Sequence, residues 1–367
     1  MEMSSSEISI NVPTQAASPG FQSRCEMLAG QQGLRFLGVA PTSVEKEHER
    51  FVEWLRSGWH AEMFFLERNS NLLKDPNSLF PGVKAALVFA LPYSQGDKFF
   101  DESPYPQVAQ YARFRDYHRI FKKSLTDIVE QLGLKEGEYR VAVDSAPLLE
   151  RAIANQTARG FIGKNTCFIH PTFGSFLLLG EILVTCDFPH DDKVAVDPTK
   201  HLPEGGCGIC NRCQVKCPTG ALDDAYRLDA RKCLSYWTIE HRGVVPLEYW
   251  RWFKEYWFGC DICQLVCPYN KKEENTNLSS RFLVREIPSL LDVVKMDQAG
   301  YEKWFGGTPM TRAGRQGLRR NALIAMVATG DAKLNEAIDA VKLSGGSPLE
   351  ETLAQIPSFL RGFQADP

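Results

Sequence analysis

Eight of the eleven cysteines in this 367-residue chain lie between Cys207 and Pro268. The stretch opens with a C-x2-C-x2-C-x3-C-P run and closes with a C-x2-C-x3-C-P run. The first run has the spacing of cysteines that ligate [4Fe–4S] clusters, in which the fourth cysteine binds the other cluster. The second run lacks its leading cysteine, because Trp257 stands at that position. Cys233, between the two runs, can supply the missing thiolate.

The eight cysteines then divide into two sets of four. We predict a first cluster set of Cys207, Cys210, Cys213 and Cys267, and a second cluster set of Cys217, Cys233, Cys260 and Cys263. Two structural zinc sites are the alternative, since zinc also favours four thiolates. Zinc ribbons usually show two separate C-x2-C pairs, however, and have no reason to place Pro after the last cysteine of each run. Disulfides are a weaker alternative, because nothing in the chain points to secretion.

The composition is that of a soluble globular protein, with 44% hydrophobic and 24% charged residues. The length allows two or three domains with their own cores, and no apolar run approaches the length of a membrane span. The first twenty or so residues lack the basic and apolar regions of a signal peptide, so we expect a flexible tail and a reducing cytoplasm. The net charge of −3 gives no global attraction to nucleic acid, which would have to bind local basic patches.

The part upstream of the cysteines alternates between strand and helix patterns. A continuous apolar run over 81–92 predicts a strand buried on both faces, as in an α/β sheet. A helix is predicted over 108–132, where Tyr117, Phe121, Leu125, Ile128 and Leu132 form one apolar stripe. Basic residues lie mostly off that stripe, on what is first of all a solvated face. We therefore predict an α/β domain that ends near residue 185.

Asp144 stands where a predicted strand over 139–144 runs into a helix. An Asp or Ser shortly before Pro147 makes a sound helix start, so capping alone explains this residue. The carboxyl end of a strand is also where open α/β sheets bind their ligands. His60, in an apolar segment, is by itself more typical of a core or capping histidine than of a ligand.

The last hundred residues read as short helices with short connections, which suggests a small helical repeat. Arg312, Arg315 and Arg319 recur at helical spacing and predict a basic stripe, either a solvated face or a contact for an anionic partner. An aromatic run over 249–258 precedes these helices. Aromatic residues near clusters are first of all packing, although with interleaved cations they can also stack on bases.

Several segments, taken in order, resemble the epoxyqueuosine reductase family over roughly residues 25 to 330. They are Asp144–Arg151, Gly160–Thr166, Gly174–Leu183, Gly206–Leu222, Leu228–Tyr236 and Gly259–Pro268. The family is cobalamin-dependent and contains iron–sulfur clusters. It reduces the epoxide of epoxyqueuosine to an alkene, with loss of water, at the wobble position of tRNAs for Tyr, His, Asn and Asp. This is the last step of queuosine synthesis.

The resemblance implies an α+β multi-domain protein. We expect a flexible tail over 1–24, an α/β cobalamin-binding catalytic domain over 25–199 and a bacterial-ferredoxin-like double [4Fe–4S] domain over 200–275. A short HEAT-like helical module that binds tRNA follows over 276–367. The cofactors would be cobalamin and two [4Fe–4S] clusters, and the partners an anticodon stem-loop and an external one-electron donor of the flavodoxin or ferredoxin type. We expect a monomer with no membrane partner.

The resemblance also implies site residues. Asp144 would be the proton donor, a role that needs a pKa raised by burial. The residues expected to line the cobalamin are His60, Asp144, Phe168, Leu179, Ser235 and Asp261. The residues chosen for contact with tRNA phosphates are Arg242, Arg312, Arg315 and Arg319, which would position the RNA without reading its sequence.

Two other functions remain open at this point. A cobalamin and iron–sulfur reductase of a small molecule, such as a relative of the reductive dehalogenases, would share the cluster domain, but those proteins usually carry a twin-Arg export signal that is absent here. A non-catalytic, ferredoxin-type electron carrier would leave the large upstream domain without a purpose.

Overall fold

The computed structural model describes residues 20–93, 107–186, 206–270 and 286–363. Its main sheet has the strand order β1 (Arg35–Ala40), β2 (Ala85–Pro92), β7 (Leu177–Val184) and β4 (Tyr139–Val143). Every neighbouring pair is antiparallel, so the prediction of an α/β sheet is wrong. The apolar runs indicated burial on both faces, which two central strands of a covered antiparallel sheet share with parallel strands.

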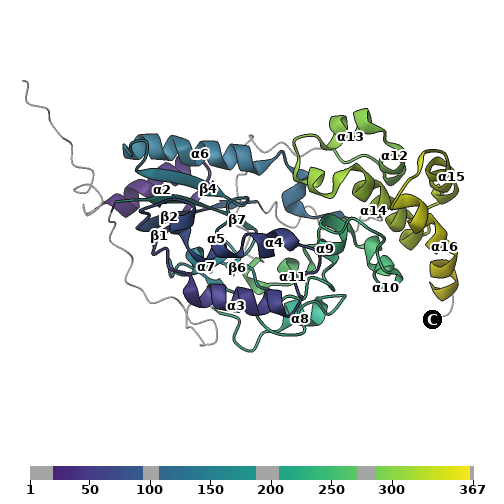
Figure 1. Ribbon diagram of the computed structural model, residues 1–367, viewed down its shortest axis with the longest axis horizontal. Coiled ribbons are helices and arrows are strands. Elements are labelled where there is room, and N and C mark those ends of the chain that lie inside the picture. Colours follow the sequence, from purple (N-terminus) through teal and green to yellow (C-terminus); the bar gives the residue numbers. More distant parts are fainter. Residues whose placement is uncertain (1–19, 94–106, 187–205, 271–285, 364–367) are drawn as a thin grey trace, which may run out of the picture.

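Helices cover both faces of the sheet (Figure 1). On one face, α2 (Phe21–Gln31) and α6 (Tyr117–Leu132) pack on alternate side chains of the strands. On the other face lies α7 (Glu150–Asn155). The predicted apolar stripe of α6 is buried throughout, and a side chain at Gly180 of β7 would come within 2.9 Å of the Phe121 ring. Glycine at that position therefore lets α6 approach the sheet closely.

The helix predicted over 108–132 begins later than expected, at Tyr117. Residues 107–108 form the short strand β3, parallel to β8 (Tyr256–Phe258), and a 3₁₀ turn follows over Gln110–Arg113. Asp116 then caps α6, because its side chain accepts a hydrogen bond from the backbone N–H of His118 at 3.0 Å. This cap brings His118 to the first turn of the helix.

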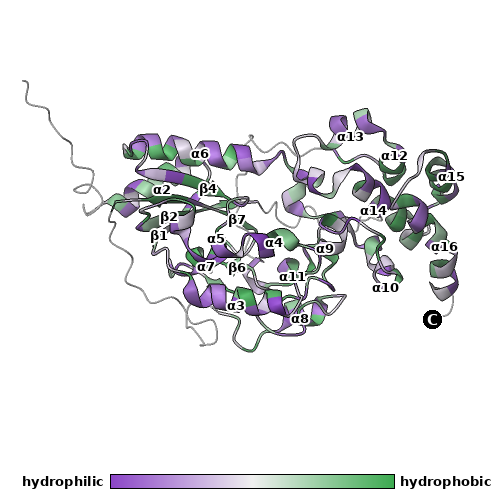
Figure 2. Ribbon diagram, viewed as in Figure 1, coloured by the Kyte–Doolittle hydropathy of each residue, from purple (hydrophilic) through white to green (hydrophobic). Residues whose placement is uncertain are grey.

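The helix predicted to begin at Asp144 also begins later, at Glu150. Asp144 has a left-handed backbone with φ of +48° and does not cap α7. The remaining elements of this part of the chain are α3 (Glu45–Arg56), the short helices α4 (Phe64–Arg68) and α5 (Ser70–Lys74), and a 3₁₀ turn over Pro76–Ser78. In Figure 2 the visible side of α3 is mostly hydrophilic, in keeping with its acidic first turn.

The cysteine-rich region consists of short elements joined by turns. In order these are α8 (Arg212–Lys216), α9 (Leu234–Ile239), α10 (Leu247–Trp250), a 3₁₀ turn (Arg251–Lys254), β8, α11 (Ile262–Leu265) and a 3₁₀ turn (Pro268–Asn270). A two-stranded hairpin of β5 (Phe161–Ile162) and β6 (Phe168–Ile169) leads from α7 towards this region. Such loop-rich structure suits a region whose chain is held by ligands rather than by long helices.

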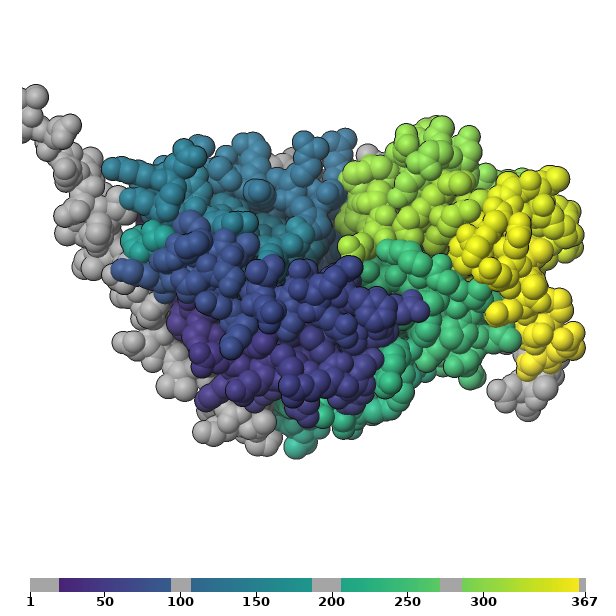
Figure 3. Space-filling view, viewed as in Figure 1, coloured from purple at the N-terminus to yellow at the C-terminus, as the bar shows by residue number. Residues whose placement is uncertain are grey.

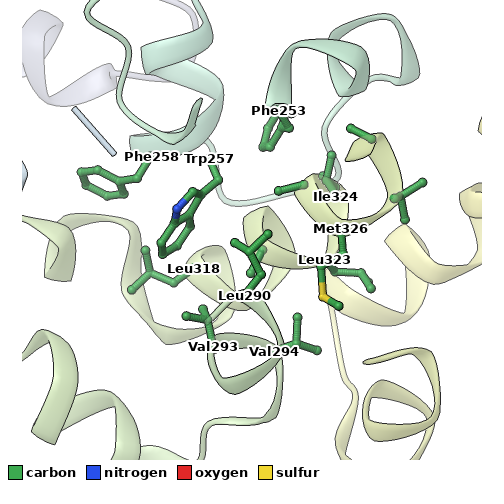
Figure 4. Close-up of a cluster of buried hydrophobic side chains, with 14 of the residues drawn as sticks. Phe253, Trp257, Phe258, Leu290, Val293, Val294, Leu318, Leu323, Ile324 and Met326 are labelled. Carbon is green, nitrogen blue, oxygen red and sulfur yellow. The ribbon is translucent and has the colours of Figure 1, made fainter. Parts of the chain in front are cut away.

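The C-terminal part is helical, as predicted. It comprises α12 (Leu290–Lys295), α13 (Gln298–Phe305), a 3₁₀ turn (Pro309–Ala313), α14 (Gly314–Thr329), α15 (Leu334–Ser344) and α16 (Leu349–Phe363). The central helix α14 is buried along most of its length. Figure 4 shows Trp257 of the aromatic run directed at side chains of α12 and α14, and Phe258 belongs to the same buried cluster. Trp250, Phe253, Trp257 and Phe258 are each at most 2% exposed, so these four residues pack and do not stack on bases.

Candidate active site and cluster region

The cysteine side chains within each predicted cluster set influence one another electrostatically. In the first cluster set, the thiol of Cys267 interacts electrostatically with Cys207, Cys210 and Cys213. Cys213 in turn interacts with Cys207 and Cys210. Within the described residues, no three His, Cys, Asp or Glu side chains are arranged to hold a metal ion. A [4Fe–4S] cluster differs from a single ion in that its ligands are distributed over several irons.

The second cluster set is grouped in the same way. Cys260 interacts with Cys217 and Cys233, and Cys263 interacts with Cys260 and Cys233. Cys233, the lone cysteine between the two runs, therefore lies with this set. A further cysteine that the spacing did not implicate, Cys167, lies directly against Cys263.

The turn over 163–166 touches the loops of both sets. Lys164 donates from Nζ to the carbonyl oxygens of Gly208 (2.8 Å) and Cys210 (2.9 Å), and from its backbone N–H to Sγ of Cys207 (3.3 Å). Asn165 donates to the carbonyl oxygen of Cys263 at 3.4 Å. The turn therefore fixes the cluster loops against the sheet domain. Local sequence patterns cannot reveal these contacts, because the partners lie more than forty residues away.

Asp144 is held at the end of β4 by two side chains of α6. Its Oδ2 accepts hydrogen bonds from Oη of Tyr117 at 2.5 Å and from Nε2 of His118 at 2.8 Å. Its backbone N–H donates to the Glu150 carboxylate. The Asp144 side chain is 54% exposed, so its remaining oxygen is free to meet a ligand from solvent. These contacts explain its left-handed backbone better than a capping role does.

His118 is in contact with a carboxylate on each side. Its Nδ1 lies 2.6 Å from Oδ1 of Asp116, and its Nε2 lies 2.8 Å from Oδ2 of Asp144. Carboxylates only accept hydrogen bonds, so both ring nitrogens must carry protons to satisfy this geometry. The hydrogen bond to Asp144 is the largest cause that raises the pKa of His118, to about 9, and Asp116 adds to the effect. At neutral pH the imidazole is therefore charged.

The expected raised pKa of Asp144 is wrong. Desolvation is the largest single influence and would raise the pKa, but hydrogen bonds from His118 and Tyr117 together outweigh it, and the pKa lies below its ordinary value. Arg312 adds a favourable positive charge. In the resting pair, the proton therefore lies on His118 and Asp144 is a carboxylate.

Two further acids lie beneath Asp144. Glu181 on β7 is fully buried, and neither of its carboxylate oxygens has a hydrogen-bond partner among the described residues. Desolvation and the charge of Asp144 raise its pKa. Desolvation and the neighbouring Glu181 likewise raise the pKa of Glu150. Burial thus favours the protonated form of both glutamates.

The residues expected to line the cobalamin are placed in three groups. Phe168 and Leu179 belong to the apolar layer on the α7 face of the sheet. Asp261 is buried, accepts the backbone N–H of Gln110 at 2.7 Å, and has a pKa that burial raises to about 6. Tyr111 interacts electrostatically with both Asp144 and Asp261, so these two acids face a common region between the sheet domain and the second cluster set.

His60 and Ser235 belong to a third group. His60 is 4% exposed, with its Nε2 2.9 Å from Oε1 of Glu67 but in poor hydrogen-bond geometry. The same loop contacts α9, which carries Ser235, through a hydrogen bond of 3.3 Å from the Glu62 backbone N–H to Oη of Tyr236.

The arginines chosen for tRNA contacts differ from one another. Arg312 is exposed, pairs with Glu240 at 3.0 Å and lies 5.0 Å over the ring of Phe65. Arg242 is exposed and donates to the carbonyl oxygen of Arg312. Arg315 is half-buried and donates to the Met296 carbonyl oxygen at 3.3 Å.

Arg319 does not belong to a surface stripe, and that part of the prediction is wrong. Its side chain is 1% exposed and donates to the carbonyl oxygen of Val294 and to the hydroxyl of Ser344. The neighbouring Arg320 is likewise buried and donates to carbonyl oxygens of His241 and Gly243. Periodicity places these residues on a helix, but it does not show that the cluster region and α12 cover their side of α14.

The paired cysteine sets and the covering sheet domain define an iron–sulfur protein with a double-cluster domain. Residues 206–270 match a family model described as “4Fe-4S double cluster binding domain”, and residues 74–145 match one described as “Epoxyqueuosine reductase QueG, DUF1730”.

The epoxyqueuosine reductase of Pseudomonas aeruginosa is 33% identical to the chain, with 90% of this chain and 91% of the relative covered. That of Escherichia coli K12 is 31% identical, with 83% and 80% covered. The chain therefore belongs to the epoxyqueuosine reductase family.

Solved structures share the fold. The structure of an epoxyqueuosine reductase with a tRNA-Tyr epoxyqueuosine-modified stem loop matches with a TM-score of 0.74 and 23% identity, covering 94% of this chain and 90% of that one. The Bacillus subtilis epoxyqueuosine reductase matches with a TM-score of 0.73 and 24% identity over the same shares. It is described as having the catalytic loop that bears an aspartate swung out of the active site. Within the described residues, no helix is long and apolar enough to cross a membrane.

Proposed function

We propose that this chain reduces epoxyqueuosine in tRNA to queuosine. The net change adds two electrons and two protons to the epoxide, leaves an alkene and releases the oxygen as water. Family membership over nine-tenths of the chain supports the reaction. The observation in the structure that supports it best is the His118–Asp144 pair, a proton source that shares its surroundings with the second cluster set.

We propose that the two sets of four cysteines are the cluster ligands. Iron–sulfur clusters pass electrons singly, so two in series form a path from an outside donor. The second cluster set lies at the inner end of this path, because Cys260 interacts with Asp261, and Asp261 in turn with Tyr111. Asn165 holds the carbonyl oxygen of Cys263 and so fixes that end against the sheet domain.

Cobalamin is the proposed second cofactor, and the buried polar atoms fit it. The carboxylate oxygens of Glu181 and Nδ1 of His60 are buried and lack hydrogen-bond partners among the described residues, and Nε2 of His60 has only the poorly aligned Glu67 carboxylate near it. Such groups are costly unless something pairs with them, and the amide side arms of a corrin both donate and accept. His60, Asp144, Phe168, Leu179, Ser235 and Asp261 are the residues that would hold it. When bound, cobalamin supplies a strongly reducing, nucleophilic metal centre that side chains lack.

The protein's own part in the chemistry is to supply a proton to the departing oxygen. Asp144 offers an exposed carboxyl oxygen at the surface, and His118 stores the proton behind it. We propose that Nε2 of His118 first gives its proton to the Asp144 carboxylate, and that the resulting carboxylic acid then protonates the departing oxygen and returns to a carboxylate. Solvent returns a proton to the His118 imidazole and supplies the second proton of the released water. Tyr117 holds the carboxylate in place through its 2.5 Å hydrogen bond. The aspartate-bearing catalytic loop described for the Bacillus subtilis relative supports the assignment to Asp144.

For tRNA binding we propose Arg242 and Arg312, with a lesser part for the half-buried Arg315. Arg312 is the most favourable candidate, because it is exposed and also close enough to Asp144 to lower its pKa. A phosphate contact there would position the modified nucleoside beside the acid. The bound stem loop of the solved relative supports this partner, and we propose that the HEAT-like helices α12–α16 form part of the same binding region. A tRNA substrate also implies a cytoplasmic site of action.

Nucleoside mass spectrometry of tRNA from a strain that lacks this protein tests the proposal. We expect epoxyqueuosine to accumulate and queuosine to return when the gene is restored. Unchanged queuosine in the deletion strain would contradict it. A strain complemented with the Asp144→Asn variant serves as the matched control for loss of chemistry without loss of the protein.

A further inference from the structure

Two of the most exposed apolar side chains in the described chain lie beside the first cluster set. Ile209 is 92% exposed and Val215 is 71% exposed. Ile209 stands between Cys207 and Cys210, and Val215 stands on α8 just after Cys213. Exposed apolar side chains grouped at one place commonly mark a surface for a partner.

The same surface is positively charged. Arg212 and Lys216 on α8 are exposed, and residues 206–222 contain no Asp or Glu. The next acid along the chain, Asp223, is paired with Lys232 at 3.1 Å. The chain as a whole is slightly acidic, with a net charge of −3, so this local excess of cations is not a property of the entire surface. It complements an acidic partner.

The first cluster set is the outer end of the electron path. The second cluster set interacts with Asp261 and Cys167 on the inner side, whereas the first is enclosed by the exposed loop and helix that carry Ile209 and Val215. Figure 1 shows α8 at the lower edge of the molecule, well separated from the start of α6, which carries His118. Side chains of this part of the chain reach the surface at the lower edge of Figure 3. A partner at α8 therefore leaves the Asp144 side of the molecule free for tRNA.

We propose that Ile209, Arg212, Val215 and Lys216 form the docking surface for a small acidic carrier protein that delivers electrons one at a time to the first cluster. In each encounter the carrier is oxidised by one electron and the cluster is reduced by one electron. Two encounters supply the two electrons that the epoxide consumes. This inference rests on the proposed function, because it assigns the entry point for its electrons.

The test is anaerobic stopped-flow reduction of the full chain, with both clusters reconstituted and without tRNA, by reduced flavodoxin. Bleaching of the visible cluster absorbance gives the second-order rate constant. We expect Arg212→Glu with Lys216→Glu to lower this constant about tenfold or more at low salt, and to weaken its dependence on ionic strength. We expect Ile209→Ser with Val215→Ser to lower it severalfold at all salt concentrations.

The matched control is Lys342→Glu with Leu343→Ser on α15, which pairs a 59% exposed lysine with an 89% exposed leucine far from the cysteines. This variant should react with flavodoxin like the unmodified chain. Iron content and the spectrum after dithionite reduction confirm that each variant holds its clusters. Equal flavodoxin rates for the docking and control variants would overturn the proposal.

Self-association is the other outcome that would overturn it. If light scattering shows a dimer that Ile209→Ser with Val215→Ser abolishes, the surface binds a second copy of this chain. Because cluster reduction is measured without tRNA, failure of docking is distinguishable from failure of the proposed function. If only the docking proposal fails, dithionite still supports epoxide reduction. If the proposed function fails, dithionite does not support it.

Discussion

The region proposed to carry electrons and the region proposed to deliver protons are built in different ways. The cluster loops take their shape from cysteines close together in sequence and are pinned to the sheet domain by Lys164. The proton site joins α6 to the end of β4 through hydrogen bonds of 2.5 to 2.8 Å. Electrons do not need a continuous chain of hydrogen bonds, whereas a proton moves only between donor and acceptor in contact. Small changes should therefore affect the proton site more than the cluster surface.

The largest effect is expected for Asp144→Asn. An amide of the same shape keeps the position of the side chain but cannot pass a proton to the departing oxygen. We predict that turnover falls by roughly 10²–10⁴-fold, while the iron content and the affinity for the tRNA stem loop are retained. Single-turnover assays with mass spectrometry measure the turnover, and filter binding measures the affinity for the stem loop. Full turnover by the variant would remove Asp144 from its assigned role.

The next largest effect is expected for His118→Gln. The variant keeps a hydrogen bond to Asp144 but no longer stores a proton, and we predict a loss of roughly tenfold to a hundredfold because water can still protonate Asp144. The groups that face this pair are Asp116, Tyr111, Tyr117, Glu150 and Arg312. Tyr117→Phe is the control, since it removes a hydrogen bond without removing the stored proton.

The pH profile separates a proton store from a structural histidine. The pKa of His118 is raised to about 9, so turnover by the unmodified chain should fall as the pH rises through about 9. In the His118→Gln variant, this fall in turnover near pH 9 should disappear. Its activity should instead be highest in acid, where solvent can protonate Asp144. The pair also stabilises the folded state. The contribution of His118 is complete below the ordinary His pKa of 6.5 and is lost as the pH rises through about 9. The contribution of Asp144, whose pKa is lowered, is lost as the pH falls below its ordinary value of 3.8. Unaltered profiles in the variant would contradict the assignment.

A smaller and more selective effect is expected from two arginines of one sequence stripe. Arg312→Ala should reduce the slope of log affinity for the tRNA stem loop against log salt concentration by about 0.9, with the melting temperature unchanged. Arg319→Ala should instead cost about 1–3 kcal/mol of unfolding free energy, since it leaves the carbonyl oxygen of Val294 without its partner. If both variants weakened tRNA binding alike at equal stability, the buried role of Arg319 would be refuted.

The same contrast explains what the sequence could predict. The grouping of seven cysteines into two runs follows from local spacing, because cluster ligands recur at short intervals. Cys233 lies outside both runs and was assigned by completing the second set of four. The apolar stripe of α6 follows from helical period. The antiparallel order of the sheet did not follow, since burial on both faces is common to parallel and antiparallel central strands. Neither did the late starts of α6 and α7, which depend on pairing between residues 107–108 and β8 and on the contacts of Asp144.

The proton store was missed for a related reason. His118 lies 26 residues before Asp144, and in the sequence it reads only as one residue inside the helix predicted over 108–132. A signal was present in the Asp116-Tyr117-His118 triplet, where an acid and a phenol flank a histidine. That triplet acquires meaning only when the strand that carries Asp144 is placed beside it. Arg319 shows the converse. Its spacing correctly predicted a helix, but the prediction that its side chain is exposed was wrong.

The central claim is that this chain itself converts epoxyqueuosine to queuosine. The most direct measurement is an anaerobic single-turnover reaction of the purified protein, with both clusters reconstituted, cobalamin and reductant present, on an epoxyqueuosine-containing tRNA stem loop. We predict a nucleoside lighter by one oxygen atom, formed in proportion to the enzyme present. Epoxyqueuosine that remains intact while both clusters are reduced and the stem loop is bound would contradict the claim.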